Sequence, residues 1–291
     1  MRRDRLLAGV RTSVAWAAIA VTSLGVLSAC GGTANPAAGQ VAAPPTAAGA
    51  NAAGPNATPD GAPADKSRTE KVKSLKGKVI VLDPGHNGGN AAHPSVINTK
   101  VNIITGYKEC DTTGTQTDAG YSEHAYNWDV ANRLKKILEG RGAKVVLTRT
   151  SDTGVGPCIN QRAAIGNRAK ADAALSVHAD GAPASGHGFH IIEPASIKGH
   201  TDKIVKNSDR LALALRAAYL KGTGIPYSSY IGKDALDRRN DLGGLNLSTV
   251  PKVFIETGNM QNPGDAAKLS DANFRQRIAQ SLAEGFAAYF A

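Results

Sequence analysis

The sequence predicts an α/β fold: a single domain with a mixed, mostly parallel twisted sheet and helices on both faces. Three observations support this fold class. Apolar, β-branched runs alternate with amphipathic segments from residue 78 onward. Three of these runs end in a polar residue, as strands do when their carboxyl ends line a site. Residues 77–291 are also enough to bury the core of one such domain.

Each element follows from its own periodicity. Short β-branched runs bounded by turn residues predict strands, and apolar residues spaced three or four apart predict helices. In residues 123–140, for example, Tyr126, Val130 and Leu134 share one helical face, and two glycines end the segment. The expected strands are residues 78–83, 144–148, 174–177, 188–192 and 252–255. The expected helices are residues 123–140, 160–170, 208–222 and 272–290.

The composition of the first 76 residues is not that of a folded core. Residues 1–29 predict a secretory signal peptide, because several arginines precede an uncharged apolar stretch and small residues follow it. The last residues before Cys30 resemble a bacterial lipobox, in which Cys30 is acylated; ordinary signal cleavage near Ala29 is the alternative. Residues 30–76 are rich in Ala, Gly and Pro and predict a disordered linker. We therefore expect an exported protein of the cell envelope, lipid-anchored to the outer face of the membrane.

Charge and cysteine usage narrow the class of protein. The net charge of +10 suits a polyanionic partner such as a cell wall, although a solvated basic surface explains it equally well. The sequence has no zinc knuckle, P-loop or aromatic RNA-binding pattern, so we expect no nucleic-acid partner, and we expect a monomer. With Cys30 assigned to a lipid, Cys110 and Cys158 are an even pair in an oxidising compartment, which predicts a disulfide. Two thiolate metal ligands are the less favoured alternative.

Three predicted strands lead into residues capable of metal or proton chemistry. These are His86 after residues 78–83, His178 after residues 174–177, and Glu256 after residues 252–255. Because the carboxyl ends of neighbouring strands meet at one edge of a sheet, we expect the three side chains to converge. A single histidine after a strand is more often structural, but two of them beside Gly- or Ala-rich turns favour a metal-dependent hydrolase.

Two imidazoles and one carboxylate form a recurrent zinc set that leaves a fourth position for water. The identity of the carboxylate is open at this point. Besides Glu256, the candidates for the third ligand are Glu109, Asp118, Glu123 and His124. Glu123 begins a predicted helix, which would hold its carboxylate on a rigid element, although a favourable charge near the helix N-terminus is the default explanation. Glu256 suits a general base and acid better, because it can take a proton from water and pass it to a leaving nitrogen.

An ordered series of motifs covers residues 79–289. These motifs are DPGHNG at residues 83–88, Glu123 with Asn127, G-x-x-V-x-L-T-R at residues 142–149, an R-x-x-x-A-N-like segment at residues 162–167, S-x-H-A-D at residues 176–180, and E-x-G at residues 256–258. The series resembles the zinc-dependent N-acetylmuramoyl-L-alanine amidases of bacterial cell-wall remodelling.

The resemblance implies zinc held by His86, Glu123 and His178, with Glu256 as the catalytic carboxylate, and it decides against His124. The implied reaction is hydrolysis of the amide between the lactyl group of N-acetylmuramic acid and the L-alanine of the stem peptide. Peptidoglycan and muropeptides are then the partners, and cell separation the implied role. The alternatives are another zinc hydrolase of wall peptides or acetyl groups, and a catalytically silent wall-binding lipoprotein.

The interval between His86 and Glu123 is longer than the family pattern. We expect the extra residues, about 91–118, to lie beside the groove with a hairpin strand at residues 101–107, fixed by the bridge from Cys110 to Cys158. Between residues 190 and 251 the sequence predicts one long helix and a polar loop, without a further helix that would offer a glutamate to plug the zinc site.

Overall fold

The computed structural model describes residues 73–291. The predicted signal peptide, Cys30 and nearly all of the predicted linker lie outside the described residues. None of the helices within residues 73–291 is long and apolar enough to cross a membrane.

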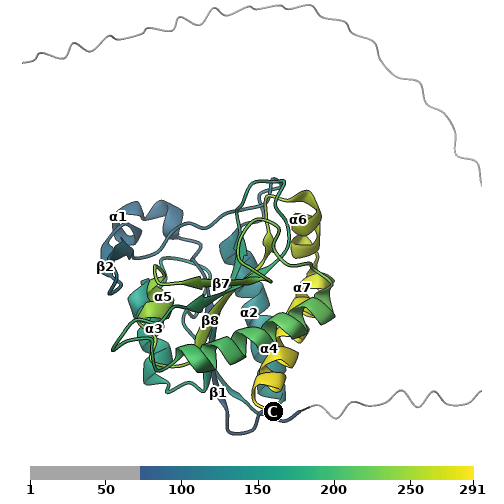
Figure 1. Cartoon of the computed structure of the whole chain (residues 1–291). Coiled ribbons are helices and arrows are strands. Elements are labelled where there is room, and N and C mark those ends of the chain that lie inside the picture. The colour runs from purple at the N-terminus through teal and green to yellow at the C-terminus, as the bar shows by residue number, and fades with distance from the viewer. Residues whose placement is uncertain (1–72) are drawn as a thin grey trace, which may run out of the picture. The chain divides into compact units, whose positions relative to one another are not determined.

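A sheet forms the centre of the described part (Figure 1). It has six strands in the order β4-β1-β5-β8-β6-β7. The strands are β1 (Val79–Pro84), β4 (Lys144–Leu147), β5 (Ala173–Asp180), β6 (His190–Pro194), β7 (Leu236–Arg239) and β8 (Lys252–Asn259). Strands β4, β1, β5 and β8 run parallel, β6 is antiparallel to β8, and β7 is parallel to β6. The sheet is therefore mixed and mostly parallel, as the sequence predicted.

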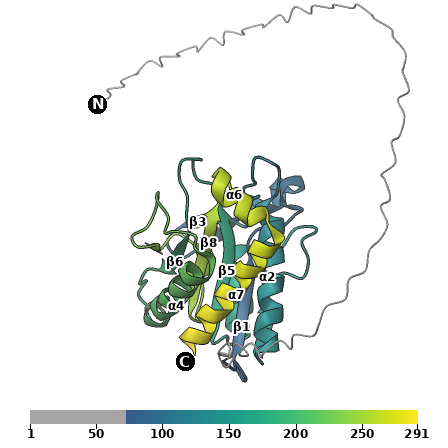
Figure 2. The ribbon, with the colours of Figure 1, turned by 90° about the vertical axis from the view of Figure 1, so that its right-hand side faces the viewer.

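Three long helices cover one face of this sheet. Figure 2 shows α7 (Ala272–Tyr289) between α2 (Glu123–Gly140) and α4 (Val205–Thr223), and all three helices contribute buried apolar residues to the largest core cluster. Strand residues such as Ile80 and Leu82 point into the same cluster. A shorter helix, α6 (Pro263–Ser270), precedes α7 and begins at Asn262, whose side chain accepts two backbone hydrogen bonds.

The opposite face carries α3 (Ile159–Arg168) and the short helix α5 (Gly243–Asn246). Side chains alternate along a strand, so Val81 points away from its neighbours Ile80 and Leu82 and packs in a separate small cluster with Ala174 and Val250. A Cβ atom placed on Gly166 of α3 would lie about 4 Å from Val81, which locates α3 against this face.

The long interval after His86 forms its own small subdomain on this side. It contains a 3₁₀ turn (Asn90–Ala92), α1 (Pro94–Ile97), and an antiparallel hairpin of β2 (Lys100–Asn102) and β3 (Tyr107–Glu109). The prediction of one strand over residues 101–107 is wrong in detail, because the chain turns in the middle of that range. Ile104 and Gly106 both have positive φ, at 77° and 156°, as a tight turn requires.

The predicted disulfide is present and joins Cys110, just after β3, to Cys158, just before α3. The two cysteines pack in a small buried cluster with residues that include Ile103 and Ile159. The insertion is therefore bound to the main domain covalently and by apolar contact.

Two other expectations change. The polar loop expected before residue 251 contains β7 and α5, which the sequence pattern missed because β7 reads LDRR and has a single apolar residue. Strands β5 and β8 also run beyond the predicted ends, so His178 and Glu256 lie inside paired strands and not after them.

Candidate active site

The site lies on the sheet face that carries α3, near the carboxyl ends of the parallel strands. His178 on β5 and Glu256 on β8 are direct register partners, so their side chains project to the same side. Phe254, two residues earlier on β8, shares that side and stacks on the His178 ring with centroids 5.2 Å apart. Strand pairing therefore fixes the relative positions of one histidine and one glutamate.

His86 and Glu123 reach the same place from other elements. His86 follows β1 in a left-handed backbone conformation with φ 59°, and Glu123 is the first residue of α2. His86 Nε2 lies 3.2 Å from Glu123 Oε2, and His178 Nδ1 lies 3.0 Å from Glu123 Oε1. One ligand atom from each of the three residues falls within 4.8 Å of the others. The structure thus brings the three expected side chains into one cluster.

Two glycines allow the histidines to approach so closely. A Cβ atom on Gly85 would lie 2.0 Å from Cε1 of His178, and one on Gly114 would lie 2.8 Å from both His86 Cδ2 and Glu123 Oε2. A side chain at either position would therefore displace a member of the cluster. Gly114 also has φ 75°, which a residue with a Cβ adopts only under strain.

Opposite charges hold this cluster together. Burial disfavours the charged form of Glu123, but His86 and His178 outweigh it and hold the pKa of this carboxyl well below its usual range. Burial likewise opposes a charge on His86, yet Glu123 and Asp111 raise the pKa of this ring to about 10. One carboxylate whose two oxygens each face an imidazole nitrogen is a donor set that fits a divalent transition metal.

Glu256 lies next to this cluster but outside it. Its Oε2 is buried and has no hydrogen-bond partner among residues 73–291. Burial raises the pKa of the Glu256 carboxyl well above its usual range, and the nearby charges of Glu123 and Asp180 raise it further. A carboxyl group with a free oxygen beside a candidate metal site is suited to accept and return a proton.

The other candidate ligands lie elsewhere. His124 is not part of the cluster, and its Nδ1 lies 2.8 Å from Asp152 Oδ2. Glu109 forms an ion pair with Lys100 on the hairpin, and Asp118 is exposed. Neither residue belongs to the His86, Glu123 and His178 cluster.

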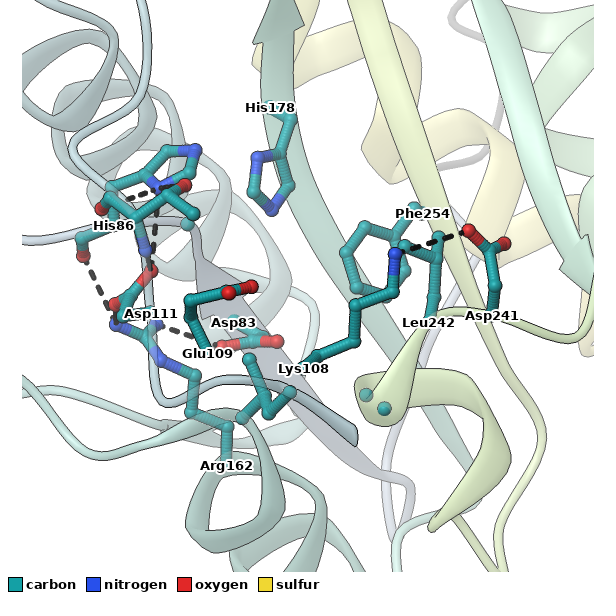
Figure 3. Close-up of a pocket in the computed structure, with 15 residues that line it drawn as sticks. Asp83, His86, Lys108, Glu109, Asp111, Arg162, His178, Asp241, Leu242 and Phe254 are labelled. Atoms are coloured by element: carbon teal, nitrogen blue, oxygen red, sulfur yellow. Dashed lines mark hydrogen bonds and ion pairs between the residues drawn. The ribbon is translucent and has the colours of Figure 1, made fainter. Parts of the chain in front are cut away.

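Two adjoining hollows meet at the two histidines. One, of about 260 Å³, extends toward the hairpin and the loop before α5, with Lys108, Glu109 and Asp241 on its wall (Figure 3). The other, of about 360 Å³, contains Glu123 and Glu256. Residues shared by both hollows are His86, Thr112, His178, Leu242 and Phe254. An extended substrate lying across both hollows would pass directly over the cluster.

A model of the N-acetylmuramoyl-L-alanine amidase family matches residues 80–288. The chain belongs to this family. The match confirms the family that the ordered motifs predicted and, with it, the class of enzyme, an amide hydrolase.

Individual relatives agree with the family. Rv3717 of Mycobacterium tuberculosis is an N-acetylmuramoyl-L-alanine amidase. It is 38% identical to this chain over 218 residues, which cover 75% of this chain and 88% of Rv3717. The crystal structure of the apo form of Ami1 from Mycobacterium abscessus is 39% identical with a TM-score of 0.70, covering 75% of this chain and all of that one. Ami1 from Mycobacterium smegmatis is 36% identical with a TM-score of 0.69, covering 74% and 98%. These likenesses confirm the predicted fold class.

The structure of the amidase also shows buried charged residues to which the sequence motifs assign no role. Asp83 of β1 is buried and forms ion pairs with Lys252 Nζ at 2.9 Å and Arg162 Nη1 at 3.1 Å. Ser176 and Thr148 each donate a hydrogen bond of 2.6 Å to the same carboxylate. This network ties β1, β5, β8 and α3 together beside the histidines.

Arg162 extends this network to the metal-site candidates. Its Nη2 donates to the backbone oxygen of His86 at 3.0 Å and to Asp111 Oδ2 at 3.1 Å. The only sequence signal was the presence of Arg162 in a family-like motif, which gave it no role. No sequence motif marked Asp111, because its contacts with His86 and Arg162 form only when the insertion folds back onto α3.

Proposed function

We propose that the amidase uses zinc held by His86, Glu123 and His178 to hydrolyse the bond between the lactyl group of N-acetylmuramic acid and L-alanine in peptidoglycan, with Glu256 as the proton-transfer group. The observation that carries this proposal is the contact of both imidazoles with the single carboxylate of Glu123, at 3.2 and 3.0 Å. The family match supports the bond cleaved.

A zinc ion held by His86, Glu123 and His178 would supply a Lewis acid for the scissile carbonyl and would lower the pKa of its bound water to near neutrality. The protein's own contribution is to hold the donors and to move the proton. Glu256 lies beside His178, and no group within residues 73–291 hydrogen-bonds to its Oε2, so it can accept the proton of the attacking water and donate it to the departing amide nitrogen. Phe254 and Leu242 line both hollows and form an apolar wall of the groove next to the cluster.

Replacement of the Glu256 carboxyl tests this mechanism. In the mature chain, Glu256→Gln is expected to keep zinc but to lose activity by about 10²- to 10⁴-fold, the usual contribution of a general acid and base. Glu139→Gln is a matched control, because Glu139 is exposed near the end of α2 and pairs with Lys135 on the same helix. Full activity of Glu256→Gln with zinc bound would exclude the proposed role.

The mass of the product from a defined muropeptide identifies the bond. Release of an intact stem peptide beginning with L-alanine supports the proposal. A shortened peptide or a loss of acetyl groups would instead indicate a different wall hydrolase. Removal of metal with a chelator should abolish the activity, and zinc should restore it, with metal content measured on the same sample.

We also propose an exported, envelope-bound amidase with its catalytic domain at residues 77–291. The supporting features are the signal-like residues 1–29, the lipobox-like segment ending at Cys30, and the composition of residues 30–76. In cell fractionation, Cys30→Ala should move the protein from the membrane to the soluble envelope or the medium. The purified catalytic domain should be a monomer by light scattering.

A further inference from the structure

We propose that Asp111, which belongs to the insertion, is a positioning residue for His86. On this view the insertion does more than border the groove, because it supplies the carboxylate that orients one of the imidazoles of the cluster. The inference rests on the proposed function, since it concerns the affinity of the site for zinc. Figure 3 shows Asp111 between His86 and Arg162, with dashed contacts to both.

The two nitrogens of the His86 ring face different surroundings. Nε2 points to Glu123 Oε2 at 3.2 Å. Nδ1 faces three oxygens from two consecutive residues: the Thr112 carbonyl at 3.1 Å, Asp111 Oδ1 at 3.3 Å and the Thr112 hydroxyl at 3.3 Å. A carbonyl and a carboxylate only accept hydrogen bonds, so they favour a proton on Nδ1. Nε2 is then the nitrogen that gives up its proton when a metal binds, and its lone pair faces the cluster, as a metal ligand requires.

His86 needs such a restraint more than His178 does. His178 lies inside β5, and its ring is stacked on Phe254 of the neighbouring strand. His86 lies beyond the end of β1 in the left-handed region, so no strand pairing fixes the direction of its side chain. The contacts around Nδ1 therefore carry the orientation of this ring.

Asp111 is itself held firmly. Its side chain is only 7% exposed, and its Oδ2 receives a hydrogen bond of 3.1 Å from Arg162 Nη2. The backbone N–H of Asp111 donates to the Ile97 carbonyl, and the preceding residue, Cys110, is bridged to Cys158. Arg162 also donates to the His86 backbone oxygen, so the same guanidinium holds both partners. The other oxygen, Oδ1, accepts the backbone N–H of Thr112 at 2.8 Å and lies 3.3 Å from His86 Nδ1, so both oxygens of the carboxylate are held in place.

Zinc affinity of the whole mature chain tests the inference, measured by competition with a chelator of known affinity. Asp111→Ala is expected to bind zinc about 10- to 100-fold more weakly, the usual effect of removing a carboxylate that orients a metal-bound histidine. Asp111→Asn, which keeps the shape but not the charge, is expected to fall between Asp111→Ala and the wild type. Asp241→Asn is a matched control, because Asp241 lines the same hollow but binds Arg239 and Lys108; it should stay within about twofold.

A purely structural role for Asp111 gives a different result. Loss of the contact with Arg162 would then lower the unfolding temperature of the metal-free protein, while the folded fraction would bind zinc as tightly as the wild type. Zinc bound within about twofold of wild type by folded Asp111→Ala overturns the inference and leaves the proposed function intact. A wild-type chain that binds no zinc overturns both.

Discussion

The ammonium group of Lys252 lies 2.9 Å from an oxygen of Asp83, and both side chains are almost completely buried. The pair links β8 to β1 across the intervening strand β5, whose Ser176 donates to the same oxygen at 2.6 Å. Arg162 adds a second buried cation at 3.1 Å. Asp83 therefore pairs with two buried cations close to the histidine cluster, and Asp111 supplies a second carboxylate to Arg162.

Loss of the Asp83 charge should be strongly destabilising. Asp83→Asn leaves the buried Lys252 without its carboxylate partner and leaves Arg162 with Asp111 alone. Breaking a buried ion pair in this way typically costs about 3–5 kcal/mol in the free energy of unfolding. Asp129→Asn is the control, because Asp129 pairs with Arg133 and Arg275 but is 34% exposed, and it should cost about 1 kcal/mol or less. Urea unfolding of the metal-free protein measures both. Equal losses for the two variants would contradict this account.

The buried carboxylate of Asp83 should also make the stability of the fold depend on pH. Burial disfavours the Asp83 charge, but Lys252 and Arg162 outweigh it and hold the pKa of this carboxyl well below its ordinary value of 3.8. A pKa that is lower in the folded state stabilises the fold above the unfolded-state value and loses this contribution as the pH falls. The free energy of unfolding attributable to Asp83 should therefore be constant near neutrality and decrease below about pH 4. Asp83→Asn should show a correspondingly shallower acid dependence than the wild type.

The bridge between Cys110 and Cys158 should stabilise the domain. It closes a loop with a sequence separation of 48 residues, for which the chain-entropy estimate is about 4 kcal/mol as an upper value. The double replacement Cys110→Ser and Cys158→Ser should lower the free energy of unfolding by up to that amount. Since Cys110 precedes Asp111, the same variant should also bind zinc more weakly. An unfolding transition unchanged by the replacement would show that the remaining contacts of the insertion suffice.

The elements that the sequence predicted well are those with a repeating apolar pattern. The bounds of α2 were predicted without error, because Tyr126, Val130 and Leu134 repeat at helical spacing and all face the core. The β7 strand was missed because an edge strand reading LDRR has no such pattern, and its pairing with β6 depends on tertiary contact.

The presence or absence of a local apolar pattern also separates the site residues that the sequence predicted from those that it did not. His86, His178 and Glu256 were found because each follows or ends a recognisable apolar run, and the structure brings His86 and His178 to Glu123. Asp111 and Lys252 were not found, since a charged residue in a loop or at a strand start has no local feature that marks it as buried. Their roles arise from pairing with Arg162 and Asp83, which are distant in sequence.

Gly85 offers a direct test of how tightly the cluster is built. A Cβ atom there would lie 2.0 Å from Cε1 of His178 and 2.4 Å from its Nε2, so Gly85→Ala must displace this ring. We expect the variant to fold but to lose most of its zinc affinity and at least tenfold in activity. Gly140→Ala is the control, because a Cβ atom on Gly140 would meet nothing within 4 Å. That change should leave activity unaltered and raise stability slightly, by up to about 1 kcal/mol. Measurement of zinc content, activity and unfolding temperature on both variants separates a displaced ligand from a general loss of folding. Wild-type zinc affinity in Gly85→Ala would mean that His178 is free to move, contrary to its stacking on Phe254.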